Sequence, residues 1–293
     1  MNLIFTVLEV VAPVFLLALI GFSWVKLGLD YRIEFVTRLA MTLSVPCLIF
    51  VALMETEISP SALTTVSLAA VVAYGFVTLG CYILVLTTKL DIRTYLAPLI
   101  FGNTGNLGLP LALFAFGTEG LGYAVVIFAI MAIYSFTFGI WLVSGSGSLM
   151  KVVKEPLVGA TLLGALFLWQ GWETPLFLTN TLELVGQMAI PMMLITLGVA
   201  VARLKPQGVG RAALISLLKA LLCIAVAWAT GLYFELPPVP FGVLVLQVST
   251  PVAVTSYLIA VKYEADAEAV AGLVVISTLL SVLLIPATLA FLI

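Results

Sequence analysis

Hydrophobic residues along this chain occur in long runs rather than in the short alternating patterns of half-buried strands. Ten runs are apolar enough and, at about 20 residues in most cases, long enough to cross the hydrocarbon core of a bilayer. The predicted helices cover residues 7–25, 36–54, 63–86, 95–115, 121–143, 156–170, 182–201, 212–231, 239–261 and 268–291. The pattern therefore predicts an all-α membrane protein with ten transmembrane helices.

The composition supports this fold class. Hydrophobic residues make up 63% of the 293 positions and charged residues only 9%, whereas a soluble domain is about 45–50% apolar and about 25% charged. A net charge of −2 without a basic patch gives no indication of nucleic-acid binding. The composition therefore predicts that the protein is embedded in a lipid bilayer.

The side-chain chemistry argues against an enzyme. The chain contains no histidine, which excludes a Ser-His triad and any His-bound metal. No acid pair or nucleophile with a base falls at membrane depth, and Cys47, Cys81 and Cys223 all lie in apolar runs as expected for small buried side chains. The sequence therefore predicts a protein that is not an enzyme and has no catalytic residues, cofactor or metal centre.

Basic residues are strongly segregated among the predicted loops. Eleven of the twelve lie in the loops that follow odd-numbered helices, whereas the loops that follow even-numbered helices carry acids. The positive-inside rule makes the basic side cytoplasmic, which predicts a multi-pass protein of the cytoplasmic (inner) membrane with both termini extracytoplasmic. The eleven are Lys26, Arg32, Arg38, Lys89, Arg93, Lys151, Lys154, Arg203, Lys205, Arg211 and Lys262.

The twelfth basic residue, Lys219, falls inside the predicted helix 212–231. At 1.5 Å per residue its depth is about 12 Å. Two interpretations are open. The side chain either snorkels to the interface or finds an internal backbone partner, or it has a direct role in lining a substrate site or in coupling.

A shift of 145 positions indicates an internal repeat. It superimposes Pro46 on Pro191, Leu39 on Leu184 and Glu119 on Glu264 in one register. A unit of five helices ends on the opposite side from its start, so the second copy would enter the membrane inverted, as in many secondary transporters. The sequence thus predicts two five-helix repeats, residues 1–145 and 146–293.

Two predicted helices at equivalent positions contain helix breakers and polar side chains. Residues 101–117 read FGNTGNLGLPLALFAFG, and residues 239–261 carry Pro251 in the sequence QVSTP. Irregular backbone inside a bilayer is tolerated only where protein or a wet cavity surrounds it, although Gly and Pro also serve ordinary close packing in membrane helices. If both helices are interrupted, their polar residues would form a chamber between them: Asn103, Thr104, Asn106, Gln247, Ser249 and Thr250.

Such a chamber favours a negatively charged ligand. Two half-helices that begin there direct positive dipole ends and free N–H groups into it, and neither interrupted core contains Lys or Arg. A carboxylate could accept hydrogen bonds from the Asn103 and Asn106 amides. Pro46 and Pro191 either kink neighbouring helices or help to line the chamber.

The stretch GNTGNLGLP, with Pro110 at its end, resembles the first crossover signature of the auxin efflux carrier family, and VSTPVAVTSYLIAV resembles the second. The resemblance covers the whole chain, and the short central loop Ser144–Glu155 is similar to that of bacterial members. It implies a fold like that of the bile acid/sodium symporters, with crossed, interrupted fourth and ninth helices. Helices 1, 2, 6 and 7 would form a scaffold domain, and helices 3–5 and 8–10 a transport domain.

The resemblance further implies an elevator-type carrier of small organic anions, such as malonate, malate or auxin-like acids, and a homodimer formed through the scaffold. Asn103, Asn106, Pro110 and the turn Ser249–Pro251 would inherit the substrate site. The coupling ion would be H⁺ or Na⁺, with Thr104, Gln247, Ser277 and Thr278 as weak sodium candidates. Glu119 and Glu264 are either coupling carboxylates or solvated interfacial acids, and a non-transporting membrane sensor on the same fold is the alternative function.

Overall fold

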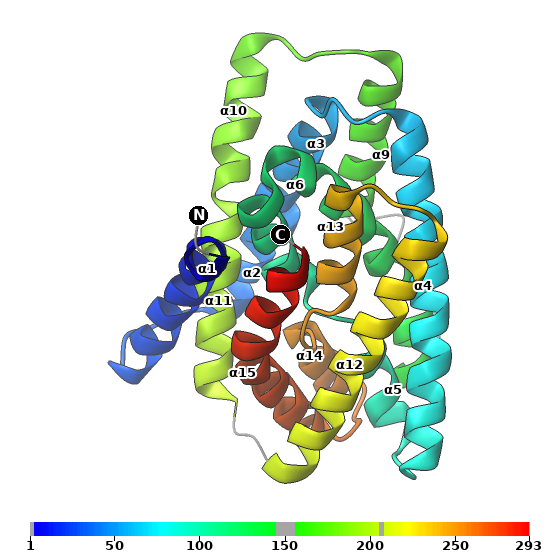
Figure 1. Ribbon diagram of the computed structural model, residues 1–293. Coiled ribbons are helices and arrows are strands. Elements are labelled where there is room, and N and C mark those ends of the chain that lie inside the picture. The colour runs from blue at the N-terminus through cyan, green and yellow to red at the C-terminus, as the bar shows by residue number, and fades with distance from the viewer. Residues whose placement is uncertain (1–2, 145–155, 205–207, 293) are drawn as a thin grey trace.

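The computed structural model describes residues 3–144, 156–204 and 208–292 (Figure 1). Within these ranges every regular element is a helix, apart from one isolated β-bridge. Most of the predicted central loop, with Lys151 and Lys154, and also Lys205, lie outside the described residues. In chain order the elements are α1 (Leu3–Lys26), α2 (Ile33–Leu39), η1 (Ala40–Ser44), α3 (Val45–Met54), α4 (Pro60–Thr87), α5 (Ile92–Ile100), η2 (Thr104–Gly108), α6 (Leu109–Tyr134), η3 (Ser135–Gly139), α7 (Ile140–Ser144), α9 (Pro156–Gln170), α10 (Leu176–Gln187), α11 (Ala189–Arg203), α12 (Val209–Tyr233), α13 (Pro238–Val248), α14 (Val254–Lys262) and α15 (Ala267–Leu292).

Seven helical stretches of the described chain are long and apolar enough to cross a membrane. They are 5–26, 33–54, 60–87, 104–144, 176–203, 209–233 and 267–292, while α9 and α13 are apolar but shorter. The prediction of an all-helical, multi-pass membrane protein is therefore confirmed. The count of ten and the inverted repeat stay predictions.

The stretch 104–144 is not one straight rod. Within α6, Gly117 has φ 67° and ψ −158°, a backbone conformation that residues with a Cβ rarely adopt. The chain turns sharply at this glycine. The turn separates the segment predicted to end at residue 115 from the one predicted to begin at residue 121.

Pro46 and Pro191 each follow an irregularity in their helix. A proline lacks the N–H that would bond the carbonyl four residues earlier, and its ring crowds that carbonyl. Residue 42 lies in the π-helical η1 that precedes Pro46, and Gln187 is the last residue of α10, directly before the helix that holds Pro191. Pro46 is half-buried and Pro191 exposed, and a role in lining a chamber stays a prediction for both.

The loops gather at two ends of the molecule. Figure 1 places the connections 88–91 and 263–266 at the lower end, and 55–59, 171–175 and 234–237 in the upper part. The described lower loops and adjoining turns hold Arg93, Arg211 and Lys262, and the upper loops hold acids such as Glu57, Glu173 and Glu235. The described lower loops also hold acids, among them Asp91 and Asp266, so it is the basic side chains that are segregated in space, as the sequence predicts. The assignment of the basic side to the cytoplasm stays a prediction.

The core is formed by helices that pack lengthwise. α1 packs along α11, and α3 packs against α9 and α10. α12 packs against α4, α13 and α15, while α13 also packs against α6. Helices of this second set also contact the other segments next to the irregular backbone: α4 contacts α5, α6 contacts η2, and α15 contacts α14.

Candidate functional site

The structure interrupts both helices that the sequence singles out, and the interruptions touch. The first break, residues 101–103, separates α5 from η2, and the second break, residues 249–253, separates α13 from α14. The Asn103 N–H donates to the Pro251 carbonyl at 2.7 Å, and the Ala253 N–H donates to the Phe101 carbonyl at 3.4 Å. Gly102 and Val252 form an antiparallel bridge between them, so each break satisfies backbone groups of the other.

Two glycines allow this close approach. A Cβ on Gly102 would lie 2.2 Å from the Thr250 Oγ1, and a Cβ on Gly108 would lie 2.2 Å from the Gln247 Oε1. Both distances are far below van der Waals contact. Gly102 and Gly108 are therefore needed because the second interrupted helix lies too close for a side chain, and not only because glycine has a flexible backbone.

The second break is held by side chains from two other helices. The Thr250 carbonyl accepts a hydrogen bond from the Lys219 Nζ of α12. The Val252 N–H donates to the Ser277 Oγ of α15 at 3.0 Å. Within the break, the Thr250 Oγ1 donates to the Gln247 carbonyl at 2.8 Å. These bonds leave the second break with its backbone tied to α12 and α15.

Around the first break, buried polar atoms lack partners. The Asn103 side chain is only 4% exposed and Thr104 is fully buried, yet the Asn103 Nδ2 and the Thr104 Oγ1 make no hydrogen bond. Gln247, also fully buried, donates from Nε2 to the Ala124 carbonyl at 3.3 Å, while its Oε1 is unpaired. Buried polar groups in proteins are nearly always hydrogen-bonded. An unpaired set of this kind is expected where a ligand or water completes the site.

The other predicted site residues are less uniform. Asn106 is half-buried in η2, and Pro110 is buried at the start of α6. Ser249 donates to the Leu246 carbonyl of its own helix at 3.2 Å, and Pro251 is buried at the contact between the breaks. Thr278, a weak sodium candidate, donates to the Val274 carbonyl of its own helix at 2.7 Å. The described residues contain no group of three or more acidic, Cys or His side chains that could hold a metal.

Lys219 does not snorkel to an interface. Its side chain is 1% exposed and its partner is the Thr250 carbonyl, so of the open interpretations an internal backbone partner is observed. A role in lining a substrate site or in coupling stays a prediction. Beside it lies a cavity of about 20 Å³ that the sequence reasoning missed. The lining hydroxyls recur at helical spacing, Ser216 three positions before Lys219 and Ser281 four after Ser277, and this period was the available signal.

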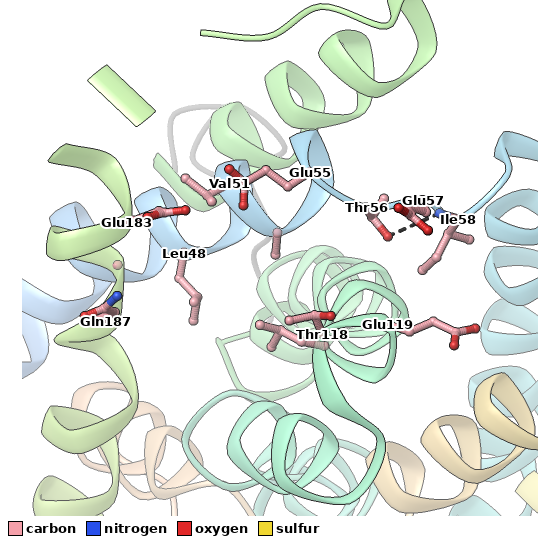
Figure 2. A pocket seen from close by; sticks show the side chains of 13 residues that line it. Leu48, Val51, Glu55, Thr56, Glu57, Ile58, Thr118, Glu119, Glu183 and Gln187 are labelled. Atoms are coloured by element: carbon pink, nitrogen blue, oxygen red, sulfur yellow. Dashed lines mark hydrogen bonds between the residues drawn. The ribbon is translucent and has the colours of Figure 1, made fainter. Parts of the chain in front are cut away.

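Two larger cavities open elsewhere on the described chain, with opposite charge. One of about 630 Å³ is lined by Glu55, Glu57, Glu119 and Glu183, whose side chains Figure 2 shows around its rim. The other, of about 640 Å³, is lined by Arg32, Arg38 and Arg203 together with Tyr31 and Glu34. The acidic cavity lies between α3, α10 and the turn of α6, and the basic cavity lies between α2, α11 and Leu258 of α14.

Glu55, at the end of α3, has a perturbed carboxyl group. Partial burial raises its pKa above the ordinary value of 4.5, and the negative charges of Glu183 and Glu173 raise this pKa further. Glu119 and Glu264 are both exposed. The sequence leaves open whether they are coupling carboxylates or solvated interfacial acids. Their exposure is consistent with solvated acids and does not test a coupling role.

Comparison with known proteins defines the class. The sequence matches the family model described as membrane transport protein in two segments, residues 6–154 and 146–289. It is also similar to an uncharacterized transporter of Methanothermobacter thermautotrophicus, with 26% identity over 95% of this chain and 96% of the relative. An uncharacterized transporter of Methanocaldococcus jannaschii is 23% identical, with the same coverage of each chain.

The molecule is thus a multi-pass helical membrane protein of the transporter class. It belongs to the membrane transport protein family, which is the auxin efflux carrier family that its two GN- and STP-containing stretches resemble. Both relatives are archaeal, so these matches give no support to the bacterial affinity that the short central loop suggested.

Proposed function

We propose that this protein is a secondary transporter of small organic anions, and that the anion binds where the first and second breaks meet. The observation that carries the proposal is the pair of buried, unpaired groups at the first break, the Asn103 Nδ2 and the Thr104 Oγ1. An amide N–H and a hydroxyl are donors that a carboxylate accepts. Hydrogen bonds to an ionised acceptor are stronger than those between neutral groups.

Helix geometry adds to this preference. η2 and α14 both begin at the breaks, and the first N–H groups of a helix lack partners within the helix. Positive dipole ends therefore face the crossing from two directions. The proposed contact residues are Asn103, Thr104, Asn106 and Pro110 from the first interrupted helix, with Gln247, Ser249, Thr250 and Pro251 from the second.

Transport would proceed by an elevator-type movement of one helix set against the other. The scaffold would comprise α1–α3 and α9–α11, and the transport domain would comprise α4–α7 and α12–α15. Support comes from the two large cavities, because both lie where elements of the proposed scaffold face elements of the proposed transport domain. The antiparallel bridge at the crossing has the local two-fold relation that inverted repeats 1–145 and 146–293 would produce.

The substrate class would be mono- and dicarboxylates of the size of malonate or malate, or auxin-like acids, with H⁺ or Na⁺ as the possible coupling ion. In a homodimer formed through the two scaffold domains, the two transport domains would lie apart from each other. The exposed apolar side chains on α1 and α10, among them Leu16, Leu19 and Leu184, suit contact with either lipid or a second scaffold.

Uptake into proteoliposomes tests the proposal. Purified protein is reconstituted, and accumulation of labelled malonate is compared with that of its neutral analogue malonamide and with protein-free vesicles. We expect saturable malonate uptake and no malonamide uptake, because only the anion complements the dipole ends. Binding of malonate without accumulation in the vesicles would instead support the sensor function.

A further inference from the structure

Lys219 is the only charged side chain among the buried residues of the described chain. An ammonium group inside a membrane protein is costly unless its environment replaces water. No buried carboxylate is available for this purpose within the described ranges. The compensation for Lys219 must therefore come from neutral oxygen atoms.

Such acceptors are found at the ammonium itself and on the wall of the cavity beside it, where they alternate with apolar side chains such as Ile224 and Leu284. Its nearest partner is the Thr250 carbonyl, just beyond the end of α13, where the helix dipole is negative. The adjoining cavity is lined by the hydroxyls of Ser216, Ser277, Ser281 and Thr288. Three of these donate their proton to a carbonyl of their own helix, Ser277 at 3.3 Å, Ser281 at 2.7 Å and Thr288 at 2.8 Å.

A hydroxyl whose proton is already used presents only lone pairs to other neighbours. The Ser216 Oγ is buried and unpaired, so it is free to accept as well. Unwound carbonyls and hydroxyl oxygens at the C-terminal end of a half-helix are the ligands with which ion-coupled carriers hold a small cation. The site around Lys219 therefore has the chemistry of a cation site rather than of an anion site.

We propose that the Lys219 ammonium is a tethered cation that permanently fills this oxygen-lined site, so that the protein binds no sodium ion there. The remaining cavity of about 20 Å³ has room for about one water molecule. The inference rests on the proposed function only in excluding this site as the place where a coupling sodium ion binds. At Ser277, one of the weak sodium candidates, the built-in ammonium charge takes the place of the ion.

The test compares the melting temperatures of the purified full-length parent and Lys219→Ala in sodium chloride and in choline chloride at equal ionic strength, without any organic anion. We expect the parent to show no saturable response to sodium. The variant should melt roughly 5 °C lower or more in choline, and sodium should restore part of the loss saturably, because the vacated oxygens can then coordinate the ion. Ser216→Ala, which lines the same cavity but keeps the ammonium, is the matched control and should remain insensitive to sodium.

Two results would overturn the inference: saturable stabilisation of the parent by sodium, or a Lys219 variant that responds to neither Na⁺ nor Li⁺. If Lys219→Ala cannot be purified, Lys219→Ser replaces it, since its short side chain also vacates the Thr250 carbonyl. Because no organic anion is present, a failure here is distinguishable from a failure of the proposed function, which the malonate uptake experiment measures separately.

Discussion

The two breaks share the same kind of backbone hydrogen bonding, but they differ in whether the polar side chains around them have hydrogen-bond partners. They exchange backbone hydrogen bonds across one antiparallel bridge. Around the second break, Lys219 and Ser277 bond to the Thr250 carbonyl and the Val252 N–H. Around the first break, the Asn103 Nδ2 and the Thr104 Oγ1 have no partner, and neither does the Gln247 Oε1, which faces Gly108 of the first interrupted helix.

This difference separates support from recognition. A polar group that already has a strong intramolecular partner must lose that partner before it can bind a ligand. A ligand that bonds to an unpaired buried group breaks no such bond, so the new hydrogen bond lowers the free energy of the complex. We therefore expect the second break to hold the geometry and the first break to supply the selective contacts. Substitutions at the two breaks should affect different quantities, stability at one and affinity at the other.

The largest effect on stability is expected where the breaks touch. Gly102→Ala places a methyl group 2.2 Å from the Thr250 Oγ1 and 3.0 Å from the Thr250 carbonyl oxygen. Separating the breaks to relieve this overlap should lower the free energy of unfolding by about 3 kcal/mol. Thermal unfolding in detergent measures the loss. Gly75→Ala on α4, where a Cβ meets nothing within 4 Å, is the control, and equal stability of both variants would refute direct contact between the breaks.

A smaller loss of stability should follow removal of the support for the second break. Ser277→Ala leaves the Val252 N–H without its acceptor, at a cost of about 1–2 kcal/mol. Thr278→Val removes a hydroxyl that bonds only within its own helix, and its effect should be smaller. Malonate affinity, measured on the same preparations, should stay close to that of the parent. A Ser277→Ala protein with unchanged stability and lost affinity would reverse the assignment of roles.

The smallest effect concerns the acidic cavity, which is lined in part by the turn that follows the first interrupted helix. The raised pKa of Glu55 means that the folded state holds this proton more tightly than the unfolded chain does. The associated stability is present below about pH 4.5 and is lost as pH rises through the folded-state pKa.

Glu55→Gln should therefore raise the melting temperature at pH 7–8, by an amount that corresponds to about 0.5 kcal/mol or less because the carboxylate is largely solvated. Melting curves of parent and variant from pH 4 to 8 give this difference directly, and the gain should vanish at the acidic end. A gain that grows as pH falls would contradict a pKa raised by burial and by the neighbouring acids.

Much of the fold was predictable because its signals are local. Long apolar runs gave most of the helix ranges, and 156–170 coincides with α9. Gly102, Gly105 and Gly108 with nearby amides predicted irregular backbone in the first interrupted helix, and Pro251 predicted it in the second. These signals need no knowledge of which helices are neighbours.

The support for the second break was not predictable, because it depends on contacts between distant positions. Ser277 lies 25 positions from Val252, and Lys219 lies 31 positions from Thr250, on helices whose apolar pattern does not reveal which face meets the break. The sequence shift also does not predict which residues meet at the crossing. The bridge pairs Gly102 with Val252, a separation of 150 positions (252 − 102), whereas the sequence shift is 145, so residues at equal repeat positions need not face each other at the crossing.

The affinity of Asn103→Ala for malonate tests the central claim most directly. This substitution removes an amide that makes no side-chain hydrogen bond from its Nδ2, so the melting temperature should stay close to that of the parent. Calorimetric titration should show a loss of affinity of at least about tenfold, because a hydrogen bond to a charged acceptor is lost. Asn180→Ala, on an exposed face of α10, should bind malonate like the parent; equal affinity of Asn103→Ala and Asn180→Ala would contradict recognition of the anion at the first break.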